Sequence, residues 1–224
     1  MSYPEQKKHR KYQPIILIGA GGHCKACIDV IEQEGRYRIA GLVDVKAKLH
    51  EKILGYEIIA TDEDLPKLVD EYPCFLITLG QIQSPQKRID RFNYLKKMGA
   101  DFPFIISPLA HVSRHASIGK GTIVMHQAFV NAGASIGRNC IVNTKADIEH
   151  DAAIGDHCHI ATGAVVNGGT CIGKGSFIGS NAVTREYITI GEKSIIGAGA
   201  VITEDVPDHT TIIGMASKRH ERRI

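Results

Sequence analysis

One histidine of this chain stands between two carboxylic acids, in the run Glu149-His150-Asp151. Neighbouring carboxylates favour the protonated imidazole, so they raise the basicity of the ring above that of an isolated histidine. Such a group suits the removal of a proton from an attacking amine or hydroxyl near neutral pH. We therefore take His150 as the candidate general base. Asp151 is the favoured tuning neighbour, Glu149 is the other candidate, and a solvated surface histidine is the alternative.

These residues lie inside a repeat of six that runs through the second half of the chain. From Val112 to Ile202, fifteen of sixteen positions spaced six apart are Val or Ile, and Thr184 is the exception. The residue two before each aliphatic is nearly always small, so each short strand would place one large and one small side chain inside. A period of six fits neither a helix nor simple strand alternation and is typical of a hexapeptide β-solenoid.

The residue after each aliphatic is Gly or Asn in ten of the sixteen repeats. Both tolerate positive φ, so we expect this position to form the sharp corners of the solenoid. One set of glycines recurs every eighteen residues, which is three hexads: Gly119, Gly137, Gly155, Gly173 and Gly191. We therefore predict a triangular coil repeated about five times. The position after Ile148 is Glu149 and not Gly or Asn, and His150 follows it. Such departures from a repeat are expected at functional residues.

The first half of the chain has a different pattern, with short apolar runs alternating with helical spacing. Strands are expected at 15–18, 39–43, 56–60 and 75–79, and helices at 24–34, 63–71 and 85–98. This alternation predicts a small parallel sheet with ligand groups at the carboxyl ends of its strands. The turn Gly19, Gly21, Gly22 resembles a dinucleotide fingerprint, but Cys24 replaces its third glycine. About one hundred residues is also short for a full dinucleotide fold. We expect one nucleotide instead, with its phosphates near the helix N-terminus and Asp44 reaching its ribose or base.

Composition narrows the classes of protein further. The 224 residues allow two compact domains, and a net charge of +3 is too mild to indicate nucleic-acid binding. No apolar run is long enough to span a membrane and no signal-peptide pattern is present, so cytoplasmic residence is the default expectation. Cys140 and Cys158 occupy the small inward slots and should stack in neighbouring coils. Cys24 and Cys27 form a C-x-x-C pair, for which we favour helix packing over a redox role.

Residues 110–203 look like the left-handed parallel β-helix of the hexapeptide-repeat acyltransferases. Combined with Gly19-x-Gly21-Gly22-His23, the chain from about 14 to 220 resembles the NeuD/PglD-like family of sugar acetyltransferases. The resemblance implies an α/β Rossmann-like half domain followed by that β-helix. The expected boundaries are a basic tail at 1–13, a nucleotide-sugar-binding domain at 14–108, the acetyltransferase β-helix at 109–206 and a C-terminal cap or tail at 207–224. It also implies a homotrimer with active sites between subunits.

The resemblance assigns expected roles to particular residues. It implies that His150 accepts a proton from the sugar nucleophile, which attacks the thioester of acetyl-CoA directly, without a covalent acyl-enzyme. The backbone N–H of Gly168 would hold the oxyanion. Contacts to acetyl-CoA would come from His159, Ser180 and Ala198. The nucleotide-sugar would lie against Gly21, Gly22, His23, Asp44 and Gly80, with Asn143 as a further candidate. No metal is expected, and Lys218 or Arg219 would touch the phosphates of CoA.

Three alternatives stay open at this level. The favoured acceptor is the amino group of a nucleotide-linked 4-amino-4,6-dideoxy sugar, but a hydroxyl acceptor, as in sialic acid O-acetylation, would use the same base. A γ-class carbonic anhydrase is also a β-helix trimer, whose three histidines bind zinc. Its H-x4-H spacing is absent here, although the chain does have His126, His150, His157 and His159. A non-catalytic scaffold is the last alternative.

Overall fold

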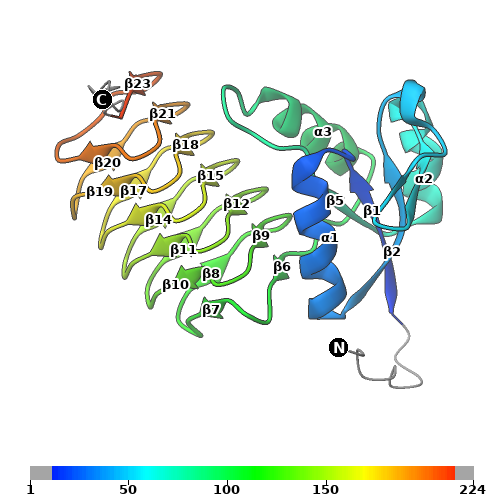
Figure 1. The fold of residues 1–224 in the computed structure, drawn as a ribbon, viewed down its shortest axis with the longest axis horizontal. Coiled ribbons are helices and arrows are strands. Elements are labelled where there is room, and N and C mark those ends of the chain that lie inside the picture. Colours follow the sequence, from blue (N-terminus) through cyan, green and yellow to red (C-terminus); the bar gives the residue numbers. More distant parts are fainter. Residues whose placement is uncertain (1–11, 215–224) are drawn as a thin grey trace, which may run out of the picture.

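The computed structural model describes residues 12–214, which form an α/β unit packed against a long parallel coil (Figure 1). The α/β unit holds a five-stranded sheet of order β3-β4-β2-β1-β5. Its strands are β1 (Gln13–Ile18), β2 (Tyr37–Val43), β3 (Lys52–Ile53), β4 (Tyr56–Ala60) and β5 (Cys74–Ile77). Its helices are α1 (Gly22–Glu34), α2 (Leu65–Glu71) and α3 (Gln86–Lys97), with single 3-10 turns η1 (Lys46–Lys48) and η2 (Asp62–Asp64). The predicted strands and helices are all present. The sheet is parallel except for β3, which pairs antiparallel with β4.

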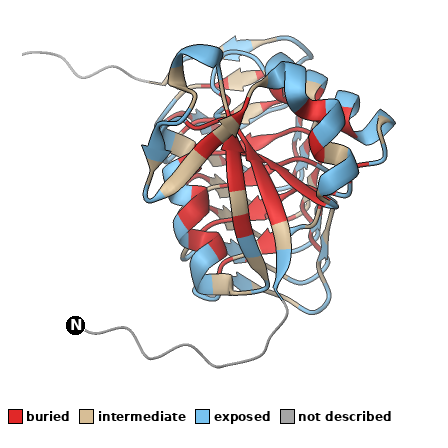
Figure 2. Ribbon diagram, turned by 90° about the vertical axis from the view of Figure 1, so that its right-hand side faces the viewer, coloured by how far each residue is buried: buried red, intermediate tan, exposed pale blue. Residues whose placement is uncertain are grey.

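Strand β1, which lies between β2 and β5, explains how this unit attaches to the coil. Its residues Ile15 to Ile18 are almost completely buried, and Figure 2 shows that the inner strands of the sheet are mostly buried. Because side chains alternate along a strand, Ile15 and Leu17 pack with α1 and with coil residues such as Ile123. Ile16 and Ile18 pack on the other face with α2 and α3. Helix α1 is therefore enclosed between the sheet and the coil.

The two cysteines of the C-x-x-C pair belong to this enclosed helix. Cys24 and Cys27 are free thiols with no exposed surface. Burial raises the pKa of the Cys24 thiol to about 11 and raises that of Cys27 as well. A redox cysteine needs an accessible thiolate. The pair therefore packs the helix, in agreement with the sequence interpretation.

The coil consists of two-residue strands in three parallel sheets. Neighbouring strands in a sheet are eighteen residues apart, except that Ile195 of β21 pairs with Thr211 of β23. The β13 sheet contains β7 (His111–Val112), β10 (Phe129–Val130), β13 (Asp147–Ile148), β16 (Val165–Val166), β19 (Val183–Thr184) and β22 (Val201–Ile202). The β14 sheet contains β8 (Ser117–Ile118), β11 (Ser135–Ile136), β14 (Ala153–Ile154), β17 (Cys171–Ile172) and β20 (Thr189–Ile190). The β15 sheet contains β6 (Ile105–Ile106), β9 (Ile123–Val124), β12 (Ile141–Val142), β15 (His159–Ile160), β18 (Phe177–Ile178), β21 (Ile195–Ile196) and β23 (Thr211–Ile212).

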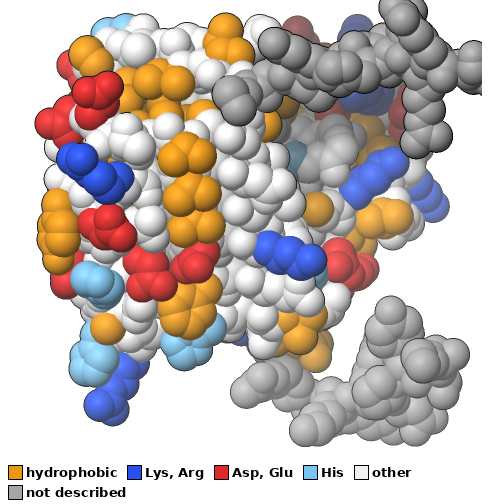
Figure 3. Space-filling model, turned by 60° about the vertical axis from the view of Figure 1, so that its left-hand side comes forward, with side chains coloured by type: hydrophobic (Ala, Val, Ile, Leu, Met, Phe, Trp, Pro, Cys, Tyr) orange, Lys and Arg blue, Asp and Glu red, His pale blue; other side chains and the backbone are white. Residues whose placement is uncertain are grey.

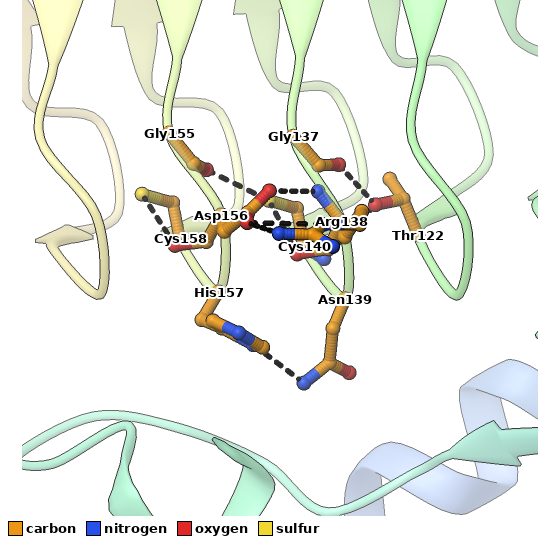
Figure 4. Close-up of polar contacts among 9 residues, drawn as sticks. All are labelled: Thr122, Gly137, Arg138, Asn139, Cys140, Gly155, Asp156, His157 and Cys158. Atoms are coloured by element: carbon orange, nitrogen blue, oxygen red, sulfur yellow. Dashed lines mark hydrogen bonds and ion pairs between the residues drawn. The ribbon is translucent and has the colours of Figure 1, made fainter. Parts of the chain in front are cut away.

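The interior of the coil follows the hexad pattern. The Val and Ile positions and the small residues two before them form one buried cluster along its length. Cys140 and Cys158 lie in neighbouring coils of this cluster, as expected. Their thiols donate to the carbonyl oxygens of Gly155 and Gly173, each at 3.1 Å. Figure 4 shows both cysteines beside the ion pair of Arg138 and Asp156.

The corner glycines have a different function from the expected one. Positive φ occurs three residues after the aliphatic, as at Asp151 (φ 61°), and not at the glycine directly after it. A Cβ on Gly137 would lie 2.6 Å from the backbone nitrogen of Asp156 in the next coil. A Cβ on Gly155 would meet the nitrogen of Lys174 at 2.8 Å in the same way. Glycine is therefore required there because successive coils stack too closely for a side chain.

A buried arginine joins the two units. Arg88 of α3 is 1% exposed, and no carboxylate among residues 12–214 pairs with it. Its guanidinium donates to the carbonyl oxygens of Ile77 (2.8 Å) and Leu79 (2.6 Å) at the end of β5. It also donates to the carbonyl oxygen (3.0 Å) and to Oδ1 (2.9 Å) of Asn139 in the coil. These bonds fix α3 and the segment after β5 against the coil.

Candidate active site

His150 lies at the corner between β13 and β14, with about half (52%) of its side chain exposed. Its Nδ1 is 2.9 Å from Oδ2 of Asp151, the next residue, which has φ 61°. That turn folds the carboxylate back onto the ring. The hydrogen bond to Asp151 is the main cause that raises the pKa of His150. Desolvation acts in the opposite direction, and the negative charges of Asp151 and Glu149 add to the rise. With a proton on Nδ1 directed at Asp151, neutral His150 presents its Nε2 lone pair as the basic atom.

Glu149 makes a different contact. Its Oε2 accepts hydrogen bonds from the backbone N–H of His150 (3.2 Å) and from Nδ2 of Asn131 (2.6 Å) in the preceding coil. Glu149 therefore supports the backbone at this corner and not the imidazole ring. The sequence interpretation did not include Asn131. It stands eighteen residues before Glu149, so the three-hexad period could have indicated it.

Gly168 lies one coil above His150. A Cβ built on Gly168 would be 2.6 Å from Nε2 of His150, so the missing side chain leaves the space that faces the basic atom. The carbonyl oxygen of Gly168 accepts the N–H of Tyr187, whereas its own N–H finds no acceptor among residues 12–214. The structure thus brings the imidazole of His150 close to Gly168, whose backbone N–H has no acceptor among residues 12–214.

A second group of predicted residues meets on the β15 sheet, where the α/β unit packs against the coil. The Nδ1 of His159 is 2.6 Å from the carbonyl oxygen of Gln81, and its Nε2 is 3.1 Å from Nδ2 of Asn143. The Oδ1 of Asn143 accepts the N–H of Thr144, so its Nδ2 must donate to Nε2. His159 therefore carries its proton on Nδ1. Burial is the main cause that lowers its pKa to about 4, so the ring is neutral.

The other residues expected in this region lie around His159. The ring centroid of His23 is 6.5 Å from that of His159, and burial lowers the pKa of His23 to about 3. Gly80 faces His23, since a Cβ on Gly80 would lie 3.8 Å from the Cβ of His23. Gly21 caps the N-terminus of α1 without any side-chain hydrogen bond. A Cβ built on Gly21 or on Gly22 would meet no atom within 4 Å, so the space beside this helix end is open.

Asp44 lies apart from Ser180 and Ala198, the two residues that, with His159, are expected to contact acetyl-CoA. Asp44 lines a cavity of about 360 Å³ at the carboxyl ends of β1 and β2. Burial acts to raise the pKa of Asp44, but hydrogen bonds from the N–H groups of Val45 (2.8 Å) and Ala20 (2.6 Å) hold it below its ordinary value. Ser180 and Ala198 lie eighteen residues apart, one above the other, at the corners after β18 and β21.

The sequence interpretation missed two kinds of residue in this region. Lys87 and Arg91 of α3 line the Asp44 cavity together with Asp62 and Asp90. Gln81 holds the imidazole of His159 through its backbone carbonyl. The charged face of α3 was visible in the sequence, but its direction toward the cavity was not. A backbone acceptor such as Gln81 leaves no signal in residue type.

The predicted residues therefore form two groups that do not touch within one chain. His150 and Gly168 lie at corners between the β13 and β14 sheets. His159, Asn143 and His23 lie where the β15 sheet meets the α/β unit, and no hydrogen bond, ion pair or ring contact joins the two groups. The described chain also shows no cluster of three His, Cys, Asp or Glu that could hold a metal ion. The histidines of the carbonic anhydrase alternative bind protein groups instead: His126 contacts Asp29 and His157 contacts Asn139 (Figure 4).

Comparisons with known proteins match both halves of the chain. The PglD N-terminal domain family matches residues 14–92, the bacterial transferase hexapeptide family 133–168 and the hexapeptide repeat of succinyl-transferase 169–204. A UDP-N-acetylbacillosamine N-acetyltransferase of Bacillus subtilis (strain 168) is 33% identical over 115 residues. That match covers 50% of this chain and 50% of the relative, so the chain spans about half of that relative's length.

Two solved structures match nearly the whole chain. PerB from Caulobacter crescentus, in complex with CoA and GDP-perosamine, is 30% identical with a TM-score of 0.84, covering 90% of this chain and 94% of that one. The acetyltransferase domain of PglB from Neisseria gonorrhoeae FA1090, in complex with acetyl coenzyme A, is 33% identical with a TM-score of 0.83, covering 91% and 97%. These matches confirm the predicted architecture, a Rossmann-like half domain followed by a left-handed parallel β-helix. No helix within residues 12–214 is long and apolar enough to cross a membrane.

Proposed function

The chain belongs to the NeuD/PglD-like family of hexapeptide-repeat sugar acetyltransferases, and from that premise we propose that it transfers the acetyl group of acetyl-CoA to an amine of a nucleotide-linked amino sugar. One observation carries the proposal: Nε2 of His150 faces Gly168, and Nδ1 is bonded to Asp151. The relatives favour an amine over a hydroxyl as acceptor, because a UDP-N-acetylbacillosamine N-acetyltransferase and a perosamine N-acetyltransferase are named for N-acetylation. We take the amine to be that of a 4-amino-4,6-dideoxy sugar.

The proposed mechanism is a direct attack. The sugar amine forms a C–N bond with the thioester carbonyl carbon, and Nε2 of His150 takes a proton from the amine. The carbonyl oxygen becomes an oxyanion held by the N–H of Gly168. Collapse of this intermediate breaks the C–S bond, and the CoA sulfur leaves with the proton from His150. The geometry supports Asp151 as the residue that orients the imidazole, because its carboxylate reaches the ring and that of Glu149 does not.

The nucleotide-sugar would bind at the carboxyl edge of the α/β sheet. In our proposal the nucleoside enters the Asp44 cavity and the phosphates approach the free N–H groups at the start of α1, near Gly21 and Gly22. Lys87 and Arg91 line this cavity, and because Arg91 is ion-paired with Asp62, Lys87 is the cation that we assign to the phosphates. The sugar then extends past Gly80 and His23 toward His159 and Asn143, the side on which acetyl-CoA would pass Ser180 and Ala198.

A panel of acceptors tests this activity. We expect CoA release from acetyl-CoA with one of the UDP-, dTDP- or GDP-linked 4-amino-4,6-dideoxy sugars. The matching free sugar should react at least about a hundredfold less efficiently in kcat/KM, because the nucleotide supplies much of the binding energy. The same nucleotide carrying a 4-hydroxyl sugar is the matched control. Turnover of that hydroxyl sugar without turnover of the amine would identify an O-acetyltransferase instead.

We further propose a homotrimer in which two chains complete each site, because the two groups of residues are separated within one chain. The outward residues of the β13 sheet would form the contact. They include Phe129, Val165, Val183 and Val201, of which Val201 is 71% exposed. Figure 3 shows this column of hydrophobic side chains on the coil, interrupted by an acidic group. The strand pairing places Asp147 between Phe129 and Val165 in this sheet. Burial, followed by the charge of Glu149, raises the pKa of its carboxyl.

Mixed trimers test whether the site is shared. The variants His150→Ala and His159→Ala should each be inactive alone. Co-expressed in equal amounts, they should recover roughly a quarter of wild-type activity, since a quarter of the shared sites would have both histidines. Trimers of a single variant, mixed after folding without subunit exchange, are the control. No recovery in verified mixed trimers would show that one chain supplies both histidines.

A further inference from the structure

Tyr187 is a large aromatic residue that packs into neither core. It lies at the corner between β19 and β20, has a positive φ of 55° and is 75% exposed. An aromatic ring contributes its large apolar area to stability or binding only when something covers it. The ring lies against Gly169, and the residue is 75% exposed, so most of its surface is available to a ligand.

The position of that ring connects it to the candidate catalytic corner. The ring lies over Gly169, where a Cβ would collide with Cδ1 of Tyr187. The backbone N–H of Tyr187 donates to the carbonyl oxygen of Gly168 at 3.0 Å. The two consecutive glycines thus have separate neighbours: Gly168 faces His150 in the coil below, and Gly169 faces Tyr187 in the coil above. The proposed oxyanion donor therefore lies between the base and the exposed ring.

We propose that Tyr187 is a cofactor-binding residue, whose ring forms the wall against which the pantetheine arm of acetyl-CoA packs. This inference rests on the proposed function. If the thioester carbonyl is held at Gly168, the acceptor approaches Nε2 of His150 and the thiol arm must leave in another direction. Gly169 and Tyr187 lie on the side of Gly168 that faces away from His150, so the arm would leave over the Tyr187 ring. Its methylene and gem-dimethyl groups match an apolar ring face. Ser180 and Ala198 lie at another edge of the coil, between the β15 and β13 sheets, and in the proposed trimer that edge would come from the neighbouring subunit.

The variants Tyr187→Ala and Tyr187→Phe separate the ring from its hydroxyl. Tyr187→Ala should raise the KM for acetyl-CoA, and the Kd for CoA measured by calorimetry, about tenfold, because a covered aromatic anchor is lost. The KM for the nucleotide-sugar should stay within about twofold, and Tyr187→Phe should bind CoA as the wild type does. Lys193→Ala is the matched control, since Lys193 is exposed and has a similar φ of 51° at another corner.

Three results would overturn the inference. An unchanged Kd for CoA in Tyr187→Ala would show that the ring does not contact the cofactor. A rise confined to the KM of the nucleotide-sugar would place Tyr187 on the acceptor side instead. A fall in molecular mass, measured by light scattering, would make it a subunit contact. Failure of the proposed function is distinguishable: the wild type would then bind no CoA, whereas tight CoA binding without turnover would mean only that the acceptor is wrong.

Discussion

Replacing His150 with alanine should lower kcat for acetyl transfer by about 10²–10⁴-fold, the range that a positioned general base contributes. The loss should appear in kcat and not in the KM of either substrate, since His150 would act on the proton that moves during the reaction. The melting temperature should change little because half of the side chain is exposed. The measurement is the initial rate of CoA release followed with a thiol reagent.

The control for this substitution is His209→Ala. His209 is also an exposed corner histidine with positive φ (58°), but it lies at a corner to which no catalytic residue is assigned. It should retain wild-type kcat and KM. If His150→Ala keeps more than about a tenth of the wild-type kcat, the base is another group or the amine reacts without one.

The pH dependence gives a second measure of the same residue. His150 can act as a base only when neutral, so kcat should rise with pH as the imidazole loses its proton. The hydrogen bond and charge of Asp151 raise the pKa of His150, so the midpoint should lie above that of an ordinary histidine. Asp151→Asn should move the midpoint to lower pH. Glu149→Gln should move it less, because Glu149 bonds to the backbone N–H and not to the ring.

Replacing Gly168 with alanine should lower kcat nearly as much as His150→Ala does, by about 10²-fold. The new methyl group would lie 2.6 Å from Nε2 of His150, and the exposed imidazole would rotate away to relieve the contact. Rotation costs little stability, because His150 packs into no core, but it removes the base from the thioester. Urea unfolding should therefore show a small change in the free energy of unfolding beside a large loss of activity.

A double-mutant cycle separates this steric effect from the loss of the oxyanion donor. In a His150→Ala background, Gly168→Ala should cost less than about threefold further, since no ring remains to be displaced. A full 10²-fold loss in that background would mean that the methyl group disturbs the oxyanion donor or the acyl group directly. Additive losses would contradict the proposed contact between the two residues.

The sequence by itself determined much of the architecture and part of the site. The hexads from Val112 to Ile202 predicted the triangular coil, because each buried position repeats with the local geometry of its own strand. The pairing of His150 with Asp151 was also predictable, since the two residues are adjacent in the chain. These features depend on residues close together along the chain or separated by one fixed period.

The tertiary structure decided what depends on distances between chain segments. Gly137 and Gly155 are required by the approach of the next coil, a separation that no single hexad encodes. The contacts of Arg88 with the carbonyl oxygen of Asn139 and of His159 with that of Gln81 help dock the α/β unit onto the coil. Backbone oxygens leave no signal in residue type. That docking places His159 beside the nucleotide half and leaves His150 at another corner. Residue types and their period are properties of the chain, whereas which surfaces meet is decided only when the two units pack.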